Sequence, residues 1–346
     1  MSLKISQYPV VRCGVLSLLL SCVLPFMAKA QDAVYSQFMF DALSVNPGLT
    51  GINDYYKLTA GFRDQWVQVN NAYVNYFASY DQKIESINSG AGIQVYNDVA
   101  GGVYSRTSVE LFYSYQFSVA KDLIISPGLQ FAMVQRALNV SGLTLPSNNI
   151  FSGDRIAQTL ENRSVLFPDV GFGVIANYSD RFSFGIAAHH LNAPVETLSE
   201  INQKRTPMSL SAHFISYFPI RFGKFDKRAM IFSPGAYFRQ QQYQNYFSAG
   251  MNIAYDPVFV GLWLRTAAGF NPESAIFMVG LEQNDFRIVY NYDHKLATST
   301  ESFPATGAHE IVLTWKFHPK KKMQTIKCSK YSLNNSSINS KIKNKR

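Results

Sequence analysis

The sequence predicts an all-β fold, an antiparallel transmembrane β-barrel of about 14 strands. Three observations predict it: apolar and polar residues alternate with a period of two, only 16% of the 346 residues are charged, and 14% are aromatic. No stretch of the body has a long helical face with a period of 3.6 residues. A water-soluble β-sandwich is the competing architecture, but its exposed faces would need more charge than this composition supplies.

The first thirty residues are organised like a cleavable secretory signal. Lys4 and Arg12 are basic, residues 14–27 are mostly apolar, and residues 28–30 read Ala-Lys-Ala, an A-x-A cleavage site. One alternative is an uncleaved anchor, for which the apolar run is short. The other is lipidation at Cys22. All three interpretations predict export.

The net charge of +9 belongs to the two ends of the chain. Residues 1–30 contain three basic residues and no acid, and residues 318–346 contain nine Lys and Arg and no acid. Residues 31–317 contain 20 basic residues, 23 acidic residues and no cysteine. The body is therefore slightly acidic, so the charge does not predict nucleic-acid binding, and no disulfide can stabilise it.

The C-terminal stretch 318–346 is rich in Lys, Asn and Ser, and we expect it to be disordered. It could contact anionic lipid as a polybasic arm, or it could be a solvated extension without a role.

The strands are predicted from the alternation. In residues 107–117 the odd positions are mainly apolar or aromatic, and the opposite face includes Ser108, Glu110, Ser114 and Gln116. The same reasoning gives strands near 55–66, 69–83, 88–97, 103–117, 122–137, 168–178, 181–190, 205–219, 228–240, 245–255, 258–268, 274–282, 284–293 and 307–317.

The connections favour an outer-membrane barrel. Those near 179–180, 256–257 and 283–285 are tight, whereas 138–167, 191–204 and 294–306 are long. Outer-membrane barrels have short periplasmic turns and longer extracellular loops. The sheet must close, because backbone polar groups in hydrocarbon need partners within it. Tyr and Phe near the strand ends suit the aromatic belts at the membrane surfaces.

Arg63 and Trp66, in the sequence Arg-Asp-Gln-Trp, are candidate interaction residues. They form either a polar contact patch with a Trp anchor at one rim or a structural feature. In the structural interpretation Trp66 belongs to an aromatic belt, and Arg63 pairs with Asp64 or with a neighbouring strand.

Two further regions could mediate contacts. Asn97 and Asp98, together with Gly101 and Gly102, predict a hairpin turn that could also serve as a recognition loop. Segment 32–54 precedes the first strand, and it could fill the lumen as a plug or cap the periplasmic mouth.

No residue pattern predicts catalysis, a cofactor or a metal site. The six histidines are scattered, and His189 and His190 should point to opposite faces of a strand, where they cannot chelate together. Gly171-Phe172-Gly173 lies within a strand and lacks the helix that follows a phosphate-binding loop. We therefore expect a protein that is not an enzyme.

An ordered set of short motifs resembles one family. The motifs are Val34-Tyr35-Ser36-Gln37-Phe38, Asn46-Pro47-Gly48-Leu49-Thr50-Gly51, Gly61-Phe62-Arg63-Asp64-Gln65-Trp66, Tyr96-Asn97-Asp98, Pro168-Asp169-Val170-Gly171-Phe172-Gly173, Gly185 to Leu191, Tyr290-Asn291-Tyr292-Asp293 and His309-Glu310-Ile311. From about Asp32 to Phe317 the chain resembles the PorP/SprF family of outer-membrane proteins in Bacteroidota. Members usually stop at the final strand, whose terminal aromatic here is Phe317, whereas this chain continues.

The resemblance implies a barrel that serves type IX secretion or gliding motility. Some members belong to the secretion apparatus, and others are outer-membrane partners of particular secreted adhesins. The resemblance makes other secretion or gliding components, an adhesin and outer-membrane lipid the expected partners. It adds Gln37, Phe38, Asn46, Pro47, Pro168 and Asp169 to the candidate interaction residues.

The sequence thus predicts four regions: a signal peptide (1–30), an N-terminal periplasmic or plug segment (31–54), the barrel (55–317) and a basic tail (318–346). The expected function is support of secretion or surface display through protein contacts in the outer membrane. A passive diffusion pore for small solutes is the alternative.

Overall fold

The structure is a computed structural model. It describes residues 41–67, 69, 72–139, 163–196, 198, 205–221, 229–242, 244–267, 271–296 and 307–318. The predicted signal peptide, the candidates Gln37 and Phe38 and nearly all of the predicted tail lie outside these residues.

Most of the described chain is strand. Its elements are α2 Ala42–Val45, η1 Pro47–Leu49, β1 Tyr56–Gln65, β2 Tyr73–Ile84, η2 Glu85–Ile87, β3 Ser89–Ala100, β4 Tyr104–Tyr115, β5 Phe117–Ala120, β6 Leu123–Leu138, β7 Arg163–Tyr178, β8 Phe182–His189, β9 Ser209–Ser216, β10 Phe218–Ile220, β11 Met230–Gln241, β12 Gln244–Tyr255, β13 Val258–Thr266, β14 Pro272–Gln283, β15 Phe286–Lys295 and β16 Ala308–Phe317.

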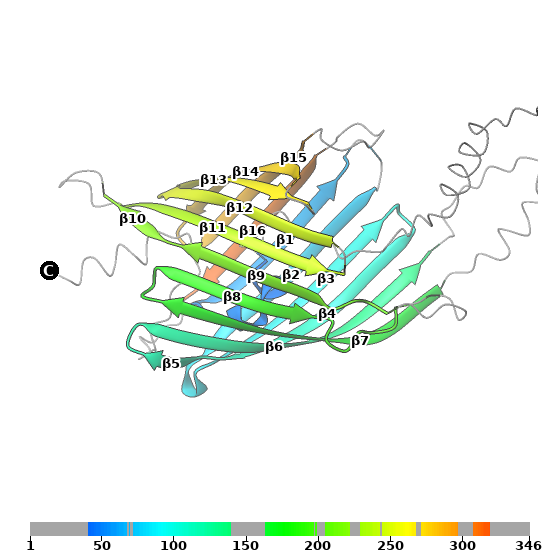
Figure 1. Cartoon of the computed structure of the whole chain (residues 1–346), viewed down its shortest axis with the longest axis horizontal. Coiled ribbons are helices and arrows are strands. Elements are labelled where there is room, and N and C mark those ends of the chain that lie inside the picture. Colours follow the sequence, from blue (N-terminus) through cyan, green and yellow to red (C-terminus); the bar gives the residue numbers. More distant parts are fainter. Residues whose placement is uncertain are drawn as a thin grey trace, which may run out of the picture. The chain divides into compact units, whose positions relative to one another are not determined.

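The strands close into one antiparallel barrel, as Figure 1 shows. Neighbours in the chain pair in order, and the ring closes where β16 pairs with β1, from Tyr56 opposite Phe317 to Gln65 opposite Ala308. Two short strands continue their predecessors: β5 follows β4 and pairs with β6, and β10 follows β9 and pairs with β11. Counting each continuation with its predecessor gives 14 strands in the wall, which confirms the predicted fold class.

A proline accompanies each of the two strand breaks. The pairing of β4 with β6 ends at Ser114 opposite Gly128, next to Pro127, and resumes with β5. The pairing of β9 with β11 ends at Ile215 opposite Gly235, next to Pro234. Proline has no N–H to donate, so it interrupts a ladder of backbone hydrogen bonds. The alternation had predicted a single uninterrupted strand in each region, at 103–117 and 205–219.

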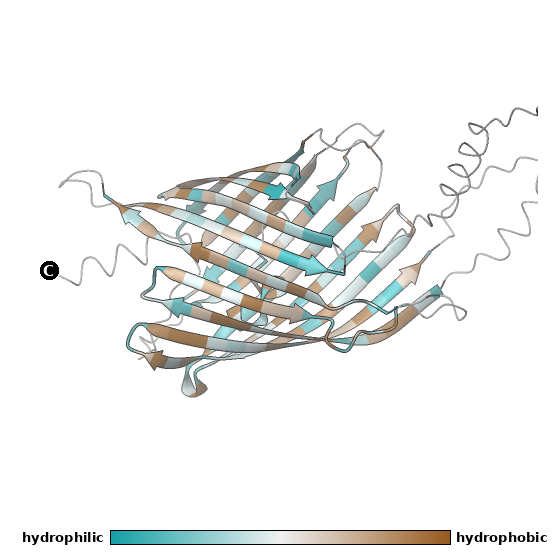
Figure 2. Cartoon of the chain, viewed as in Figure 1, coloured by the Kyte–Doolittle hydropathy of each residue, from teal (hydrophilic) through white to brown (hydrophobic). Residues whose placement is uncertain are grey.

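The two faces of the wall are inverted relative to a soluble protein. On β4, Val109, Leu111 and Tyr113 are exposed, whereas Ser108 and Ser114 are buried. Figure 2 shows the resulting alternation of brown and pale residues along the strands. An apolar outer face and a polar inner face are what a barrel surrounded by lipid requires.

The two ends of the barrel differ. We call one the turn end, where Ser179 to Arg181, Asp256 to Pro257 and Asn284 to Asp285 make tight connections. We call the other the loop end; it carries the connections between β6 and β7 and between β15 and β16, together with the short turn at Gln242. Within the described residues, no helix is both long and apolar enough to cross a membrane.

Candidate functional site

Arg63 on β1 lies between two carboxylates inside the barrel. Its Nη1 is 3.2 Å from Glu310 Oε2, and its Nη2 is 3.3 Å from Asp293 Oδ2. Asp293 Oδ2 also accepts a hydrogen bond from Arg265 Nη2 at 2.7 Å. The partners of Arg63 therefore come from the neighbouring strands β16 and β15. Asp64, the next residue of β1, points to the opposite face of the strand from Arg63. It is paired in register with His309 of β16.

A second layer of charges lies near the turn end. Lys316 contacts Glu282, and Arg287 Nε donates to Glu282 Oε2 at 2.6 Å. Lys57 Nζ on β1 lies 3.2 Å from Asp81 Oδ1 on β2. Buried charges need such compensation, because removing an ion from water costs several kcal/mol.

Large apolar side chains fill the interior between these two layers. They are Phe77, Phe259, Trp263, Ile276, Met278, Val289 and Val312, all buried. We call the inner face of β13, β14, β15, β16 and β1 the ion-pair wall. Its charges are balanced mainly among its own strands, so it needs no additional chain to cover them.

Residues 41–55, which we call the luminal segment, lie inside the barrel. The side-chain amide of Asn46 makes three hydrogen bonds. Its Nδ2 donates to the backbone oxygens of Val174 (3.2 Å) and Ile186 (2.9 Å), and its Oδ1 accepts from Gly48 N at 2.9 Å. An Asn side chain can thus tie the segment to two strands at once, β7 and β8. Asn46 and Pro47, which the family resemblance singled out, are both buried.

Inward-facing polar side chains hold the backbone of the luminal segment. Ser114 Oγ, Gln116 Nε2 and Ser126 Oγ donate to the carbonyl oxygens of Thr50, Gly51 and Gly48 at 2.7, 2.9 and 2.8 Å, respectively. Ala42, Leu49 and Ile52 pack with Ile124 and Ile175 in an apolar cluster. We call the inner face of β3, β4, β6, β7, β8 and β9 the segment wall, because it carries most of these contacts.

Glycines of the segment wall let the backbone of the luminal segment approach the backbone of the wall closely. A Cβ atom at Gly90 would lie 2.1 Å from the carbonyl oxygen of Thr50, and one at Gly128 would lie 2.3 Å from the carbonyl carbon of Pro47. Any side chain at these positions would push the segment away.

Asp41 is the first residue of the luminal segment, and it is buried. Its Oδ1 accepts a hydrogen bond from Gln94 Nε2 at 3.0 Å. Burial raises the pKa of Asp41, although Ser44 and Gln94 oppose the shift by hydrogen bonding to the carboxylate.

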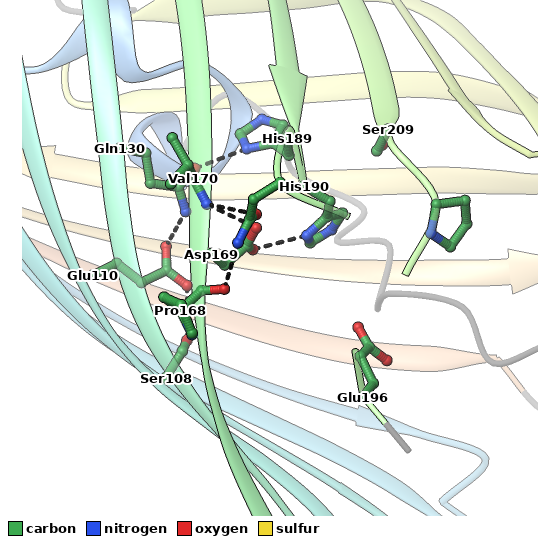
Figure 3. A network of polar contacts seen from close by, with 12 residues as sticks. Ser108, Glu110, Gln130, Pro168, Asp169, Val170, His189, His190, Glu196 and Ser209 are labelled. Atoms are coloured by element: carbon green, nitrogen blue, oxygen red, sulfur yellow. Dashed lines mark hydrogen bonds and ion pairs between the residues drawn. The ribbon is translucent and has the colours of Figure 1, made fainter. Parts of the chain in front are cut away.

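A chain of polar contacts crosses the segment wall near the loop end, as Figure 3 shows. Ser108 Oγ donates to Glu110 Oε1 at 2.7 Å, and Gln130 Nε2 donates to Glu110 Oε2 at 2.8 Å. His189 Nδ1 lies 2.8 Å from Gln130 Oε1, and its Nε2 lies 3.5 Å from the backbone oxygen of Val45. The network thereby connects β4, β6 and β8 with the luminal segment.

His190 corrects one prediction from the sequence. It does not point away from His189: its Nδ1 lies 2.7 Å from Asp169 Oδ2 on β7, and it is buried next to the same network (Figure 3). The cause is the backbone of His190, whose φ of 59° is left-handed and ends the strand alternation. No group of three His, Cys, Asp or Glu side chains in the described ranges is placed to hold a metal ion.

The connection after β8 folds against β7 and β6. Leu191 N donates to Val170 O at 2.9 Å, and Asn192 Nδ2 donates to Pro168 O at 2.7 Å. Farther on, Glu196 forms an ion pair with Arg136 of β6. The candidates Pro168 and Asp169 thus anchor this connection near the loop end.

The remaining candidate residues are separated. Asn97 and Asp98 lie within β3, not in the turn that was predicted there; the turn begins at Gly101, with φ 60°. Asn97 Nδ2 donates to Thr107 Oγ1 at 2.6 Å, whereas Asp98 is buried and accepts from Tyr73 and Asn75. Trp66 follows β1 at the loop end and is 40% exposed.

Sequence reasoning missed Ser114, Gln116 and Ser126 as contact residues. The sequence contained part of the information, because all three residues fall on the polar face of predicted strands. The alternation shows that such residues point inward, but it cannot show which of them meet the luminal segment.

The chain matches the model of one protein family, and its fold is similar to those of several solved barrel structures. The family model described as "Type IX secretion system membrane protein PorP/SprF" matches residues 27–315. No curated protein sequence matches the chain.

The similar solved structures share little sequence with the chain. The Pseudomonas putida toluene transporter TodX matches with 10% identity and a TM-score of 0.46, over 84% of this chain and 95% of that one. BamA from Haemophilus ducreyi, lacking POTRA domains 1–3, matches with 8% identity and a TM-score of 0.38, over 76% and 70%. The KdgM porin matches with 8% identity and a TM-score of 0.35, over 76% and 99%.

Proposed function

Because the chain belongs to the PorP/SprF family of type IX secretion system membrane proteins, we propose that it supports the secretion or surface display of cargo proteins through protein contacts. It is a non-enzymatic outer-membrane barrel in this proposal. The predicted signal at residues 1–30 exports it, the turn end faces the periplasm, and the loop end faces outside. The proposed partners are other secretion or gliding components and a secreted adhesin.

The observation that carries this proposal is the packed interior. Each of the 14 strands of the wall contributes an inward-facing residue that is at most 5% exposed: Thr59, Ser79, Gln94, Ser114, Ser126, Ile175, Ser183, His213, Ile231, Asn252, Trp263, Ile276, Val289 and Val312. A water-filled channel would leave the residues around it accessible to water. The burial of these inward-facing residues favours a protein that acts through its surfaces over one that conducts solutes.

The luminal segment supports the same conclusion. It is bonded to the wall through side chains and through its own main chain. We propose that it is a permanent plug, since most of its described residues are buried. The competing function is a passive pore for small solutes.

The first experiment separates these two functions. Purified full-length protein is reconstituted in planar bilayers, and its conductance is compared with that of a variant in which residues 42–53 are replaced by a Gly-Ser linker of equal length. We expect no steady conductance from the natural protein and steady conductance from the variant. Steady conductance from the natural protein would support the pore.

The second experiment tests the role in secretion. The gene is deleted in its host, and secreted and surface-bound proteins are quantified with and without the natural gene. We expect the loss of a defined set of exported proteins from the medium or the cell surface, with rescue by the natural gene. An unchanged set of exported proteins would contradict the proposal.

A further inference from the structure

The outer face of the barrel carries acids and histidines in one region. Among the described strand residues, those on the outward alternation belong to consecutive strands: Glu273 on β14, His294 on β15, His309 on β16 and Asp64 on β1. Glu273 is paired with Arg265, 3.5 Å away. No Lys or Arg of the described strands falls on this alternation. The ionisable part of the outer face is therefore confined to the strands around the seam where β16 pairs with β1.

The outward side chains at this seam form one continuous surface. We call Asp64, Tyr290, Tyr292, His294 and His309 the seam patch. Asp64 is in register with His309 across the seam. The hydroxyl oxygen of Tyr290 lies 2.7 Å from His309 Nδ1. The ring of Tyr292 lies 5.1 Å from that of His309 and 5.9 Å from that of His294. The patch is thus a row of rings with a carboxylate at its edge.

Two polar groups of the seam patch are available for a contact with another molecule. Within the described residues, the Asp64 carboxylate makes no hydrogen bond or ion pair, and His309 uses its Nδ1 but not its Nε2. Both side chains are only partly buried. An acceptor and an imidazole nitrogen therefore lie side by side on the outer face.

The seam patch lies within the depth of the lipid. Tyr56 and Phe317 are register partners near the turn end, and Asp64 follows Tyr56 by eight residues on the same strand, which is roughly 26 Å at 3.3 Å per residue. With a strand tilt of about 40°, this is about 20 Å across the membrane, less than the height of about 25 Å of the apolar band of such barrels. A carboxylate at this depth costs free energy in lipid, so a polar contact there is stabilising.

Apolar side chains border the seam patch on its turn-end side. Phe62 on β1, Ile311 on β16 and Phe277 on β14 all point outward and are exposed. Polar groups within such surroundings hold protein surfaces together in a membrane, because lipid tails offer them no hydrogen bonds.

The chemistry of the seam patch is complementary to itself. A two-fold axis perpendicular to the membrane keeps every residue at its own depth, and two-fold dimers are the commonest oligomers. Asp64 and His309 are register partners on adjacent strands. An axis that passes in front of the seam therefore places Asp64 of one copy opposite His309 of the other copy, and the reverse. Two equal contacts then satisfy both groups in both copies.

We propose that the seam patch is the surface through which two copies of this chain form a two-fold dimer in the plane of the outer membrane. Other occupants fit less well. A lipid phosphate would meet the Asp64 carboxylate with no Lys or Arg on the described patch to balance it, and lipid tails would leave that carboxylate without a polar contact. The proposal concerns the assembly of the barrel in the membrane, and it does not depend on the role in secretion.

Disulfide crosslinking tests which side of the barrel meets a second copy. Phe62→Cys and Ile311→Cys replace register partners that point outward just below the seam patch. Ile186→Cys is the matched control, because Ile186 is exposed on β8, on the opposite side of the ring of strands. Each is made in full-length protein that carries Cys328→Ser, and this parent alone gives the background. The proteins are reconstituted in vesicles at a low ratio of protein to lipid and treated with a membrane-permeant oxidant.

We expect a crosslinked dimer from Phe62→Cys and from Ile311→Cys, and only background from Ile186→Cys. Equal crosslinking of Ile186→Cys would indicate random collisions and would overturn the proposal. The absence of dimer at both seam positions would overturn it as well, and would indicate that lipid or a different membrane protein covers the patch.

Removal of the carboxylate tests the chemistry of the contact. In Asp64→Ala two contacts are lost per dimer, and we expect the dissociation constant of the dimer, measured by single-molecule subunit counting in vesicles, to rise by about tenfold or more. Asp64→Asn retains an oxygen acceptor and should weaken the dimer less. Gln135→Ala is the control, because Gln135 is exposed on the outward alternation of β6, away from the seam.

Only folded protein is counted, as identified by the shift in gel mobility that intact barrels show on heating. A dissociation constant that Asp64→Ala leaves unchanged, or that Gln135→Ala raises equally, would contradict the assignment of the interface to the seam patch.

Discussion

The segment wall and the ion-pair wall both contain inward-facing glycines, but these glycines face different neighbours. In the segment wall, a Cβ at Gly90 would meet the main chain of Thr50 at 2.1 Å. In the ion-pair wall, a Cβ at Gly280 would meet the ring of Phe259, also at 2.1 Å. One wall accommodates a backbone from elsewhere in the chain, and the other accommodates side chains of its own strands.

This difference shows that a barrel interior can be filled in two ways. The segment wall is complementary to one fixed backbone, so its stability depends on shape and on hydrogen bonds. The ion-pair wall is filled by aromatic rings and by charges that neutralise one another, so its stability depends on charge balance. Four experiments test the contrast, from the largest expected effect to the smallest.

The largest effect is expected at the shared carboxylate of the ion-pair wall. Asp293→Asn leaves Arg63 and Arg265 without their common partner, and breaking a buried pair in this way costs about 3–5 kcal/mol. The free energy of unfolding in urea, measured in detergent or bilayers, checks this. Asp285→Asn is the control, because Asp285 pairs with His318 in an exposed position. An equal effect of both substitutions would show that charge balance does not govern this wall.

The second effect concerns the hydrogen bonds of the luminal segment. Asn46→Ala removes three of them, and at about 1 kcal/mol per bond we expect a loss of about 2–3 kcal/mol. Amide hydrogen exchange in residues 41–55 should accelerate. Asn97→Ala is the matched control, since the Asn97 amide bonds to Thr107. Unchanged exchange in Asn46→Ala would contradict the role of this side chain.

The third effect compares the two kinds of glycine directly. Gly90→Ala must displace the main chain of Thr50, and we expect a cost of about 1–3 kcal/mol. Gly280→Ala meets the end of the Phe259 side chain, which can move, so its cost should be smaller by about 1 kcal/mol. Unfolding midpoints of the two variants provide the measurement. A larger loss in Gly280→Ala would reverse the comparison.

The smallest effect is expected in the pH dependence of stability that Asp41 causes. Burial raises the pKa of Asp41, so the folded protein retains this proton at pH values where the unfolded chain has lost it. The contribution to stability is therefore largest below the ordinary Asp pKa, falls as pH rises toward the raised pKa, and is constant above it. Asp41→Asn should remove this dependence. Hydrogen exchange of the luminal segment between pH 4 and pH 8 tests this, and identical pH profiles of both proteins would count against it.

The alternation of residues was sufficient to predict the wall. Ser108, Glu110 and Ser114 are inside and Val109 and Leu111 are outside because a period of two fixes the faces of a strand. The breaks after Tyr115 and Ser216 were not predicted, because their causes, Pro127 and Pro234, lie on the neighbouring strands.

The interior site could be predicted only in part. Arg63 had neighbouring strands among its expected partners, but Asp293 and Glu310 lie more than 200 residues away in the sequence. Local patterns contain no information about such contacts. The left-handed backbone at His190 was also missed, because residues other than glycine adopt it uncommonly and no glycine marked the position.

The pairing of β16 with β1 has a consequence for the order of assembly. The luminal segment is bonded to strands that follow it early in the chain, from Asp81 on β2 to Ser211 on β9. These bonds do not involve the pairing of β16 with β1, so the wall can hold the segment while the seam is still open. The last strand then brings Lys316 over the ring of Tyr55, 5.3 Å from its centre. The segment would serve as an internal template for the wall, present before the seam is sealed.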